Sequence, residues 1–153
     1  MTRIGVISDT HGLLRPEAEE RLAGMEQIIH AGDIGDPGIV PRLRRIAPTT
    51  VIRGNVDSAD WAAEYPERIT VEIGGRTFHL LHDLKELDVD PVAAGFDVVI
   101  AGHSHRPKAE TIDGVLYLNP GSAGPRRFRL PITLATLELT EDRIEATIHA
   151  ILV

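Results

Sequence analysis

Residues whose side chains commonly bind metals occur along this chain in five short clusters. They are D-x-H at 9–11, G-D at 32–33, G-N-x-D at 54–57, H-D at 82–83 and G-H-x-H at 102–105. Carboxylate or amide oxygens combined with imidazole nitrogens, without sulfur, suit Mn, Fe, Co, Ni or Zn. Seven such side chains are too many for one ion and about right for two ions that share a carboxylate: Asp9, His11, Asp33, Asn55, His82, His103 and His105.

The segment IAGHSHRP (100–107) supports two interpretations when it is taken alone. Two histidines with one residue between them lie on the same face of a strand and could share metals. They could equally be ordinary polar residues in the loop after a strand, just as Asp9 and His11 could be a helix cap and a loop histidine. An isolated motif of this kind is weak, but five in order, each after a strand-like run, favour metal binding.

Nine segments have the β-branched and apolar composition of strands. They are 3–8, 25–32, 49–54, 68–75, 76–82, 96–102, 114–121, 132–139 and 143–152. The pair Gly74-Gly75 predicts a hairpin between two of them. Alternation within 68–75 and 132–139 predicts half-buried antiparallel strands, whereas the continuous apolar runs 3–8, 49–54 and 96–102 predict buried central strands.

Three segments between these strands are predicted to be helical: 15–24, 36–47, with Asp36 as its N-cap, and 88–95. Strands alternate with helices in the first two-thirds of the chain and form hairpins in the last third. This order predicts an α/β fold with mixed sheets and outer helices. Ligands of open α/β sheets bind beyond the carboxyl ends of the strands, so the polar clusters should converge there. The glycines at 32, 54, 102 and 121 would allow sharp turns beside the ions.

Length and composition predict a single domain, 1–153, with a packed core. The net charge of −7 argues against broad electrostatic binding of nucleic acid or of an anionic membrane. A small phosphate-bearing substrate remains compatible, because bound metals would supply the positive charge. Cysteine is absent, which excludes disulfides and thiolate metal sites. The sequence has neither a signal peptide nor an apolar stretch of membrane-spanning length, so a cytoplasmic location is expected.

In their order and spacing, the five clusters resemble the pattern of the calcineurin-like metallophosphoesterases, and within them the small prokaryotic phosphodiesterases. The resemblance extends from residue 4 to about residue 125. It implies a four-layer αββα sandwich with two mixed β-sheets flanked by helices. It also implies two divalent ions, manganese first and nickel, zinc, iron or cobalt as alternatives. The first ion would be held by Asp9, His11 and His105, the second by Asn55, His82 and His103, with Asp33 bridging them.

The resemblance further implies a hydrolase that cleaves a P–O bond of a small phosphodiester through attack of a hydroxide bridging the two metals. Asp33, Asn55 and His103 would be catalytic, and Asn55 would also contact substrate. Arg126 and Arg127, in the segment 124–131, are either phosphate contacts or part of a solvated loop. A phosphomonoesterase or nucleotidase using the same site and a non-catalytic metal-binding scaffold both stay open, as does a homo-oligomer.

Two positions depart from the family pattern. Many members have histidine in the middle of G-N-x-D, where it contacts phosphate or protonates the leaving group. Val56 occupies that position here and can do neither. Glycine usually follows the histidine at position 82, whereas this chain has Asp83, which adds a carboxylate near the metals.

The remaining histidines are predicted to be structural: His30 as a buried, hydrogen-bonded side chain, and His79 and His149 as strand residues away from the clusters. Asp57 is predicted to orient its neighbours in the turn. Trp61 and Tyr65 could pack either at the mouth of the site or at a subunit contact.

Overall fold

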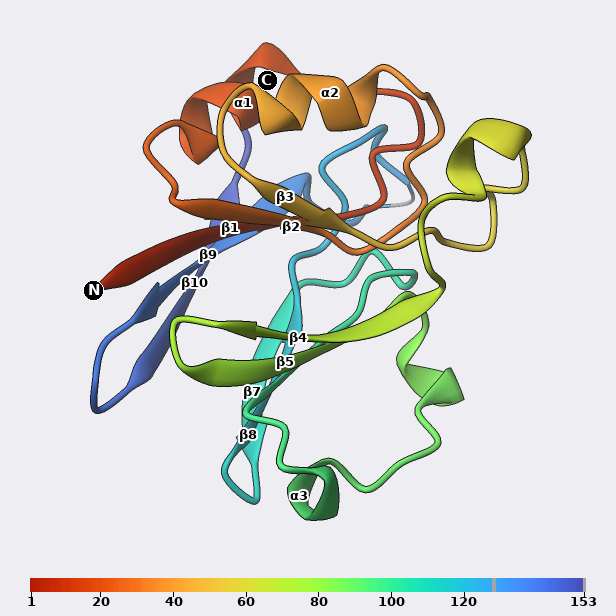
Figure 1. The fold of residues 1–153 in the computed structure, drawn as a ribbon. Helices are drawn as coiled ribbons and strands as arrows, with labels where there is room; N and C mark the ends of the chain where they lie inside the picture. Colours follow the sequence, from red (N-terminus) through yellow and green to blue (C-terminus); the bar gives the residue numbers. More distant parts are fainter. Residues whose placement is uncertain (128, 153) are drawn as a thin grey trace.

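Two mixed β-sheets stack face to face in the computed structural model, which describes residues 1–127 and 129–152 (Figure 1). The first sheet has the order β10-β9-β1-β2-β3, formed by Ile144–Ala150, Thr133–Leu139, Thr2–Ile7, Gln27–His30 and Thr49–Val51. The second has the order β4-β5-β6-β8-β7, formed by Arg68–Ile73, Arg76–Leu81, Val98–Ile100, Val115–Asn119 and Lys108–Ile112.

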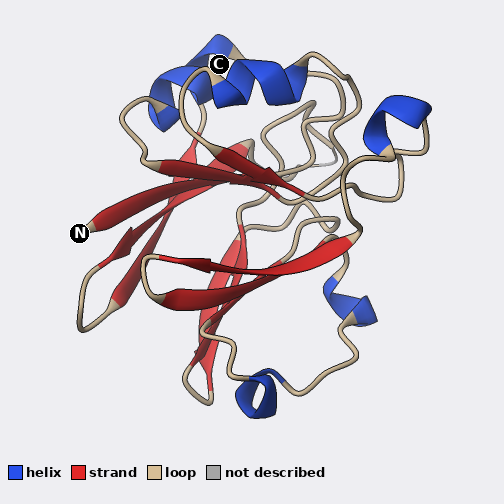
Figure 2. Ribbon diagram, in the orientation of Figure 1, coloured by secondary structure: helices blue, strands red, loops and turns tan. Residues whose placement is uncertain are grey.

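Helices form the outer layers (Figure 2). Helices α1 (Pro16–Leu22) and α2 (Ile39–Arg44) cover the first sheet. The layer on the second sheet is thinner. It contains the short helices η2 (Leu84–Glu86) and α3 (Pro91–Ala94), and its chain packs Leu87 and Phe96 against that sheet. A further short helix, η1, spans Asp60–Ala62. The predicted four-layer αββα sandwich is therefore confirmed.

Strand β1 shows how the apolar pattern builds these layers. Ile4 and Val6 point into the core between the sheets, where they pack with Phe78 of β5, and Ile7 points to the core under the helices. All four side chains are fully buried. Burial of such a side chain contributes about 1.5–3 kcal/mol, so this two-sided core holds the strand firmly and fixes where its carboxyl end lies.

Parallel pairing brings the predicted polar clusters to one edge of each sheet. Strands β1, β2 and β3 are parallel neighbours in the first sheet, and β5, β6 and β8 are parallel neighbours in the second. The segments that follow these strands carry the clusters at positions 9–11, 32–33, 54–57, 82–83 and 102–105. Because the two sheets are stacked, the two sets of loops meet.

Several element predictions need correction. Strand β3 was predicted to be central, but it is a three-residue strand at the edge of the sheet, where it pairs with β2 alone. Strand β7 was not expected, since every residue in it is exposed and its sequence lacks an apolar face. Helix α2 begins after Gly38 and not at Asp36, whose carboxylate instead accepts a hydrogen bond from the Gly38 amide at 2.7 Å.

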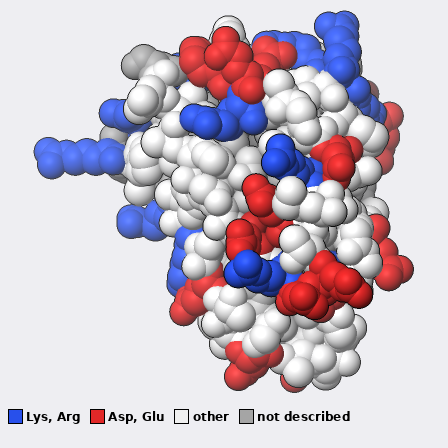
Figure 3. All heavy atoms as spheres, turned by 90° about the vertical axis from the view of Figure 1, so that its left-hand side faces the viewer, with Lys and Arg blue, Asp and Glu red and all other residues white. Residues whose placement is uncertain are grey.

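The predicted hairpin at Gly74-Gly75 is confirmed, and both residues have the positive φ angles that such a turn requires. Within residues 1–127 and 129–152, no helix is long and apolar enough to span a membrane. Acidic and basic side chains are intermingled on the face drawn in Figure 3.

Candidate metal centre

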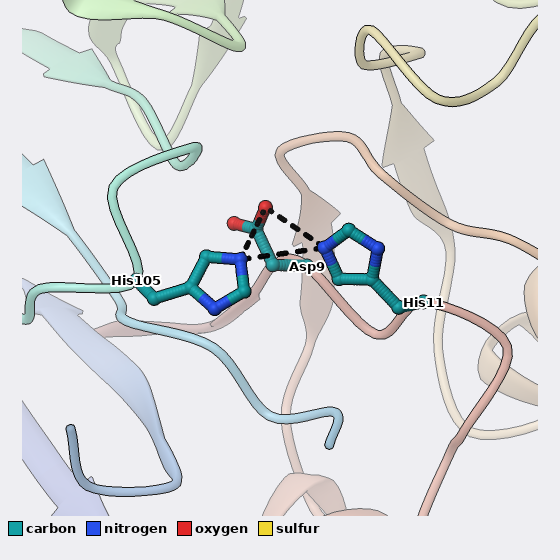
Figure 4. Close-up of side chains that lie close together, drawn as sticks. All are labelled: Asp9, His11 and His105. Atoms are coloured by element: carbon teal, nitrogen blue, oxygen red, sulfur yellow. Dashed lines mark hydrogen bonds and ion pairs between the residues drawn. The ribbon is translucent and has the colours of Figure 1, made fainter. Parts of the chain in front are cut away.

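One group of potential ligands joins the loops that follow β1 and β6 (Figure 4). The Oδ1 atom of Asp9 lies 3.4 Å from Nε2 of His105 and 3.6 Å from Nε2 of His11. The two Nε2 atoms are 3.3 Å apart. Three atoms with metal-ligand chemistry therefore surround one small volume.

A second group combines the loops that follow β2, β5 and β6. Ligand atoms of Asp33, His82 and His103 all lie within 4.8 Å of one another. The closest pair is Oδ2 of Asp33 and Nε2 of His82, at 3.1 Å. Asn55 joins the group because its Oδ1 lies 3.2 Å from Nδ1 of His103.

The two groups meet at Asp33. Its Oδ2 atom, 3.1 Å from His82, is also 3.6 Å from Nε2 of His11 in the first group. Oδ1 of Asp9 lies 3.7 Å from Nε2 of His82, which connects the groups a second time. One carboxylate oxygen thus faces an imidazole of each group, the placement that a bridging ligand requires.

Hydrogen bonds to the chain orient each of these ligands. Oδ2 of Asp9 accepts bonds from the Ser8 hydroxyl at 2.7 Å and from the His103 amide at 3.1 Å, which leaves Oδ1 facing the histidines. Oδ1 of Asp33 accepts a bond from the amide of Val56 at 3.1 Å and leaves Oδ2 facing His82 and His11. This is the pattern of metal sites, where outer partners hold a ligand so that its other atom faces the ion.

His82 is oriented in the same way. Its Nδ1 donates to the carbonyl oxygen of Ala31 at 2.7 Å, which leaves the Nε2 lone pair directed at the carboxylates. Nε2 of His82 and Oδ1 of Asp9 are buried and have no hydrogen-bond partner among the described residues. Buried polar atoms are rarely left in this state, so the two atoms fit a bound cation.

The backbone is strained at these positions. Asp9, His11, Asp33, His103 and His105 all have φ between 45° and 69°. The described residues contain one further non-glycine residue with positive φ, Asp113 in a turn. Such conformations cost on the order of 1–3 kcal/mol each and are typical of functional sites.

The glycines expected beside the ions have two different roles. Gly32 and Gly121 have positive φ, as a sharp turn requires, whereas Gly54 and Gly102 do not. Gly54 and Gly102 provide space instead: an added Cβ at Gly54 would clash with Asp33, and one at Gly102 with Ser8 and Asp9.

Two buried residues connect the loops. Asp57 accepts bonds from the amides of Ile34, Gly35 and Gly54 at 2.9–3.0 Å, which confirms that it orients its neighbours. His30 is fully buried, and its Nδ1 accepts from the amide of Gly32 at 3.1 Å.

The other nitrogen of His30, Nε2, therefore donates to the Thr10 hydroxyl at 3.0 Å, and Thr10 donates to the carbonyl of Ile34 at 2.9 Å. Burial lowers the pKa of His30 to about 4, so this side chain is neutral at pH 7. It ties the loop after β1 to the loop after β2 without adding charge.

His79 and His149 are structural, as predicted. His79 bonds Thr70 at 2.8 Å and stacks on Phe96 with ring centroids 4.5 Å apart. His149 bonds Thr136 at 2.8 Å.

The charges within the centre favour a cation. Burial by itself raises the pKa of Asp9, but the neighbouring imidazoles of His105 and His11, 3.4 and 3.6 Å from its Oδ1, outweigh burial and hold that pKa well below its usual value. The pKa of Asp33 is likewise lowered, because His82 outweighs the effect of burial. Burial lowers the pKa of His82, yet the Asp33 carboxylate 3.1 Å from its Nε2 and the charge of Asp9 raise that pKa to about 9. A divalent ion would replace that proton.

The structure separates the two predicted substrate arginines. Arg127 reaches the centre, with Nη2 3.5 Å from Nδ1 of His11. Arg126 is exposed and makes no side-chain hydrogen bond or ion pair within the described part of the chain. Residue 128, inside the same segment, lies outside the described residues.

Val56 and Asp83, the two residues that depart from the family pattern, both lie at the metal centre. Val56 is 46% exposed. Oδ2 of Asp83 lies 3.8 Å from Nε2 of His103. Trp61 and Tyr65 pack against the core under α1 and α2. This packing explains their burial without a place at the mouth of the site or at a subunit contact.

Asn119, the last residue of β8, had been assigned no role from the sequence. Its Nδ2 donates to the carbonyl of Gly102 and to the hydroxyl of Ser104, both at 3.0 Å, and its Oδ1 accepts from the amide of Gly121. Its position at the carboxyl end of a parallel strand was the available signal, but a single asparagine at a turn matches no specific metal-binding motif.

Comparison with known proteins agrees with this geometry. A model of the calcineurin-like phosphoesterase superfamily domain matches residues 2–142. The chain is 33% identical to a probable metallophosphoesterase of Methanothermobacter thermautotrophicus, covering 95% of this chain and 90% of the relative. It is 28% identical to phosphodiesterase MJ0936 of Methanocaldococcus jannaschii, covering 78% and 82%. The crystal structure of a predicted phosphoesterase from Streptococcus pneumoniae matches with a TM-score of 0.77 and 25% identity, covering 97% of this chain and 89% of that one.

The chain therefore belongs to the calcineurin-like phosphoesterase superfamily. It is a metal-dependent phosphoesterase, a hydrolase acting on ester bonds.

Proposed function

We propose that the protein is a phosphodiesterase with two divalent ions. The first ion is held by Asp9, His11 and His105, the second by Asn55, His82 and His103, and Asp33 bridges them. The observation that carries the proposal is the position of Asp33 Oδ2, 3.6 Å from Nε2 of His11 and 3.1 Å from Nε2 of His82. Manganese is the ion proposed first, with nickel, zinc, iron and cobalt as alternatives, because a donor set that mixes oxygen with nitrogen and lacks sulfur suits all five.

Two ions bound there would neutralise charge on the phosphate oxygens and lower the pKa of a water that attacks phosphorus. The residues of the chain orient the carboxylates that would hold these ions. Ser8 and the His103 amide fix Asp9, and the Val56 amide fixes Asp33, so both carboxylates hold their orientation without substrate. Such preorganisation avoids reorganisation during the reaction.

The exposed side of the centre is where substrate would bind. Asn55 and His103 are both exposed. Arg127, 3.5 Å from the ring of His11, would contact a phosphate oxygen there. We retain Arg126 as a candidate contact on its sequence position alone. The substrate is a small phosphate ester, in keeping with the family.

The diester preference follows from what surrounds the phosphate. A monoester carries an additional negative charge, and Asp83 places a carboxylate 3.8 Å from His103. Repulsion from this carboxylate would weigh more against a monoester than against a diester.

The test compares a diester with its matching monoester. Chelator-treated protein is reloaded separately with Mn²⁺, Ni²⁺ or Zn²⁺ and assayed with bis(p-nitrophenyl) phosphate and p-nitrophenyl phosphate. We expect kcat/KM for the diester to exceed that for the monoester at least about tenfold, a difference of 1.4 kcal/mol. Asp33→Asn should abolish turnover, and His149→Gln, which lies away from the centre, should retain it.

Faster turnover of the monoester would establish the monoesterase alternative. Absence of turnover with every metal, in protein that binds two ions, would establish the non-catalytic scaffold.

A further inference from the structure

A pocket lies beside the metal centre, on the outer face of the second sheet. Its volume is about 620 Å³, within the usual range of small-molecule sites. Val99, Ala101 and Tyr117 line it, and all three belong to the apolar cluster of that face. Leu84, which is 44% exposed, adds apolar surface. We refer to this hollow as the sheet-face pocket.

The sheet-face pocket adjoins the metal centre through His103 and Asp83. Both residues also line a smaller pocket of about 190 Å³, together with Asn55 and His82. His103 therefore stands between the ligands of the second ion and the apolar surface. A phosphate bound beside His103 would therefore lie next to the apolar surface.

The charge of the sheet-face pocket is opposite to that of the whole chain. Among the described residues, three basic side chains line it, those of Lys85, Arg106 and Lys108, and one acidic side chain, that of Asp83. The chain as a whole carries a net charge of −7. Lys108 pairs with Glu110 at 2.7 Å. Neither Lys85 nor Arg106 has an ion-pair partner within residues 1–127 and 129–152.

We propose that the sheet-face pocket binds one ester group of the substrate, and that this group is an apolar ring bearing an anionic substituent. The ring would lie against Val99, Ala101 and Tyr117, and the anion would face Arg106, with Lys85 beside it. A guanidinium suits a carboxylate or phosphate because it can donate two parallel hydrogen bonds. The proposal rests on the proposed function, since it assigns the organic part of the phosphodiester.

The test uses phosphonates, which the enzyme cannot hydrolyse at their P–C bond. The zinc-loaded protein is titrated calorimetrically with methylphosphonate, phenylphosphonate and 4-carboxyphenylphosphonate. We expect affinity to increase in that order, with about a tenfold gain from the ring and a further tenfold from the carboxylate. Amide NMR shifts induced by the carboxylated probe should include the segments 99–106 and 117–118.

Variants separate the two contributions. Arg106→Ala should remove most of the tenfold ratio between the carboxylated and plain phenyl probes, and Lys85→Ala should reduce it. Arg143→Ala removes an arginine from the β9–β10 hairpin and should leave this ratio unchanged. Val99→Phe should fill the floor of the sheet-face pocket and weaken the binding of both aryl phosphonates. Val99 is buried, and Val99→Phe could therefore fail to fold. In that case the variants at the exposed residues Arg106 and Lys85 still test the proposal.

Equal affinity for the three phosphonates, or a ratio that Arg106→Ala does not alter, would overturn the pocket assignment. Diester turnover combined with equal phosphonate affinities would overturn the pocket assignment alone. The expected phosphonate order without diester turnover would overturn the proposed function and leave the pocket as a binding site for anionic aryl phosphonates.

Discussion

Nε2 of His11 and Nε2 of His105 face each other at 3.3 Å, although the two residues are 94 positions apart in the chain. Oδ1 of Asp9 lies within 3.6 Å of both nitrogens. Two imidazole lone pairs and a carboxylate oxygen at this separation repel one another unless a proton or a metal ion lies between them. All three residues adopt positive φ angles in this arrangement, a strained conformation that the surrounding structure must hold in place.

The first prediction concerns metal content. Protein stripped by a chelator and reloaded with Mn²⁺ should contain two ions per chain by elemental analysis. Its melting temperature should rise, because a ligand at a hundred times its Kd adds about 2.7 kcal/mol of stability. His105→Ala should reduce the content to one ion, and His79→Ala should keep two. A single ion in the wild type would contradict the dinuclear assignment.

The second prediction concerns Asn55. Its amide oxygen, 3.2 Å from Nδ1 of His103, would be a neutral ligand of the second ion. Asn55→Ala should lower the occupancy of that ion and reduce diester kcat by about 10²-fold, the typical loss when one group that stabilises the transition state is removed. Asn55 is exposed, so circular dichroism should show an intact fold. Unchanged turnover would remove Asn55 from the site.

The third prediction concerns pH. The pKa of His82 in the metal-free protein is raised to about 9, above its ordinary 6.5. Its contribution to stability is therefore complete below pH 6.5 and is lost as pH rises through 9. Between these values, metal binding must displace the proton, so apparent Mn²⁺ affinity should rise up to about tenfold per pH unit. Titrations between pH 6.5 and 8 measure this slope.

His82→Gln provides the control for the pH experiment. It should abolish the decline in metal-free stability between pH 6.5 and 9, while the wild type retains it. A pH-independent Mn²⁺ affinity in the wild type would show that His82 does not carry the displaced proton.

The fourth prediction concerns Val56, which cannot protonate a leaving group. A general acid typically contributes about 10²–10⁴-fold, and p-nitrophenolate departs without needing one. The wild type should therefore show a steep decrease of log kcat/KM with rising leaving-group pKa. Val56→His should flatten that slope, because residue 56 is exposed beside the centre. A shallow slope in the wild type would mean that another group already donates the proton.

Local sequence pattern was sufficient for the strand segments, the hairpin at Gly74-Gly75 and the polar clusters after the strands. These features depend on short-range rules: apolar periodicity, the positive φ of paired glycines, and the tendency of polar residues to follow buried strands. The same rules missed β7 and assigned a central place to β3. An exposed edge strand has no apolar face, and the position of a strand in a sheet depends on its neighbours.

The sequence by itself determined which residue types are available for metal binding and that they follow strands. The tertiary structure decided which atoms face one another. It placed Oδ2 of Asp33 between His11 and His82, turned Nε2 of His82 inward through the bond to Ala31, and brought Arg127 but not Arg126 to the centre. It also placed Arg106 beside an apolar hollow. These relations join residues far apart in sequence, and they arise because the packing of the two sheets fixes where the loops meet and how each side chain is oriented.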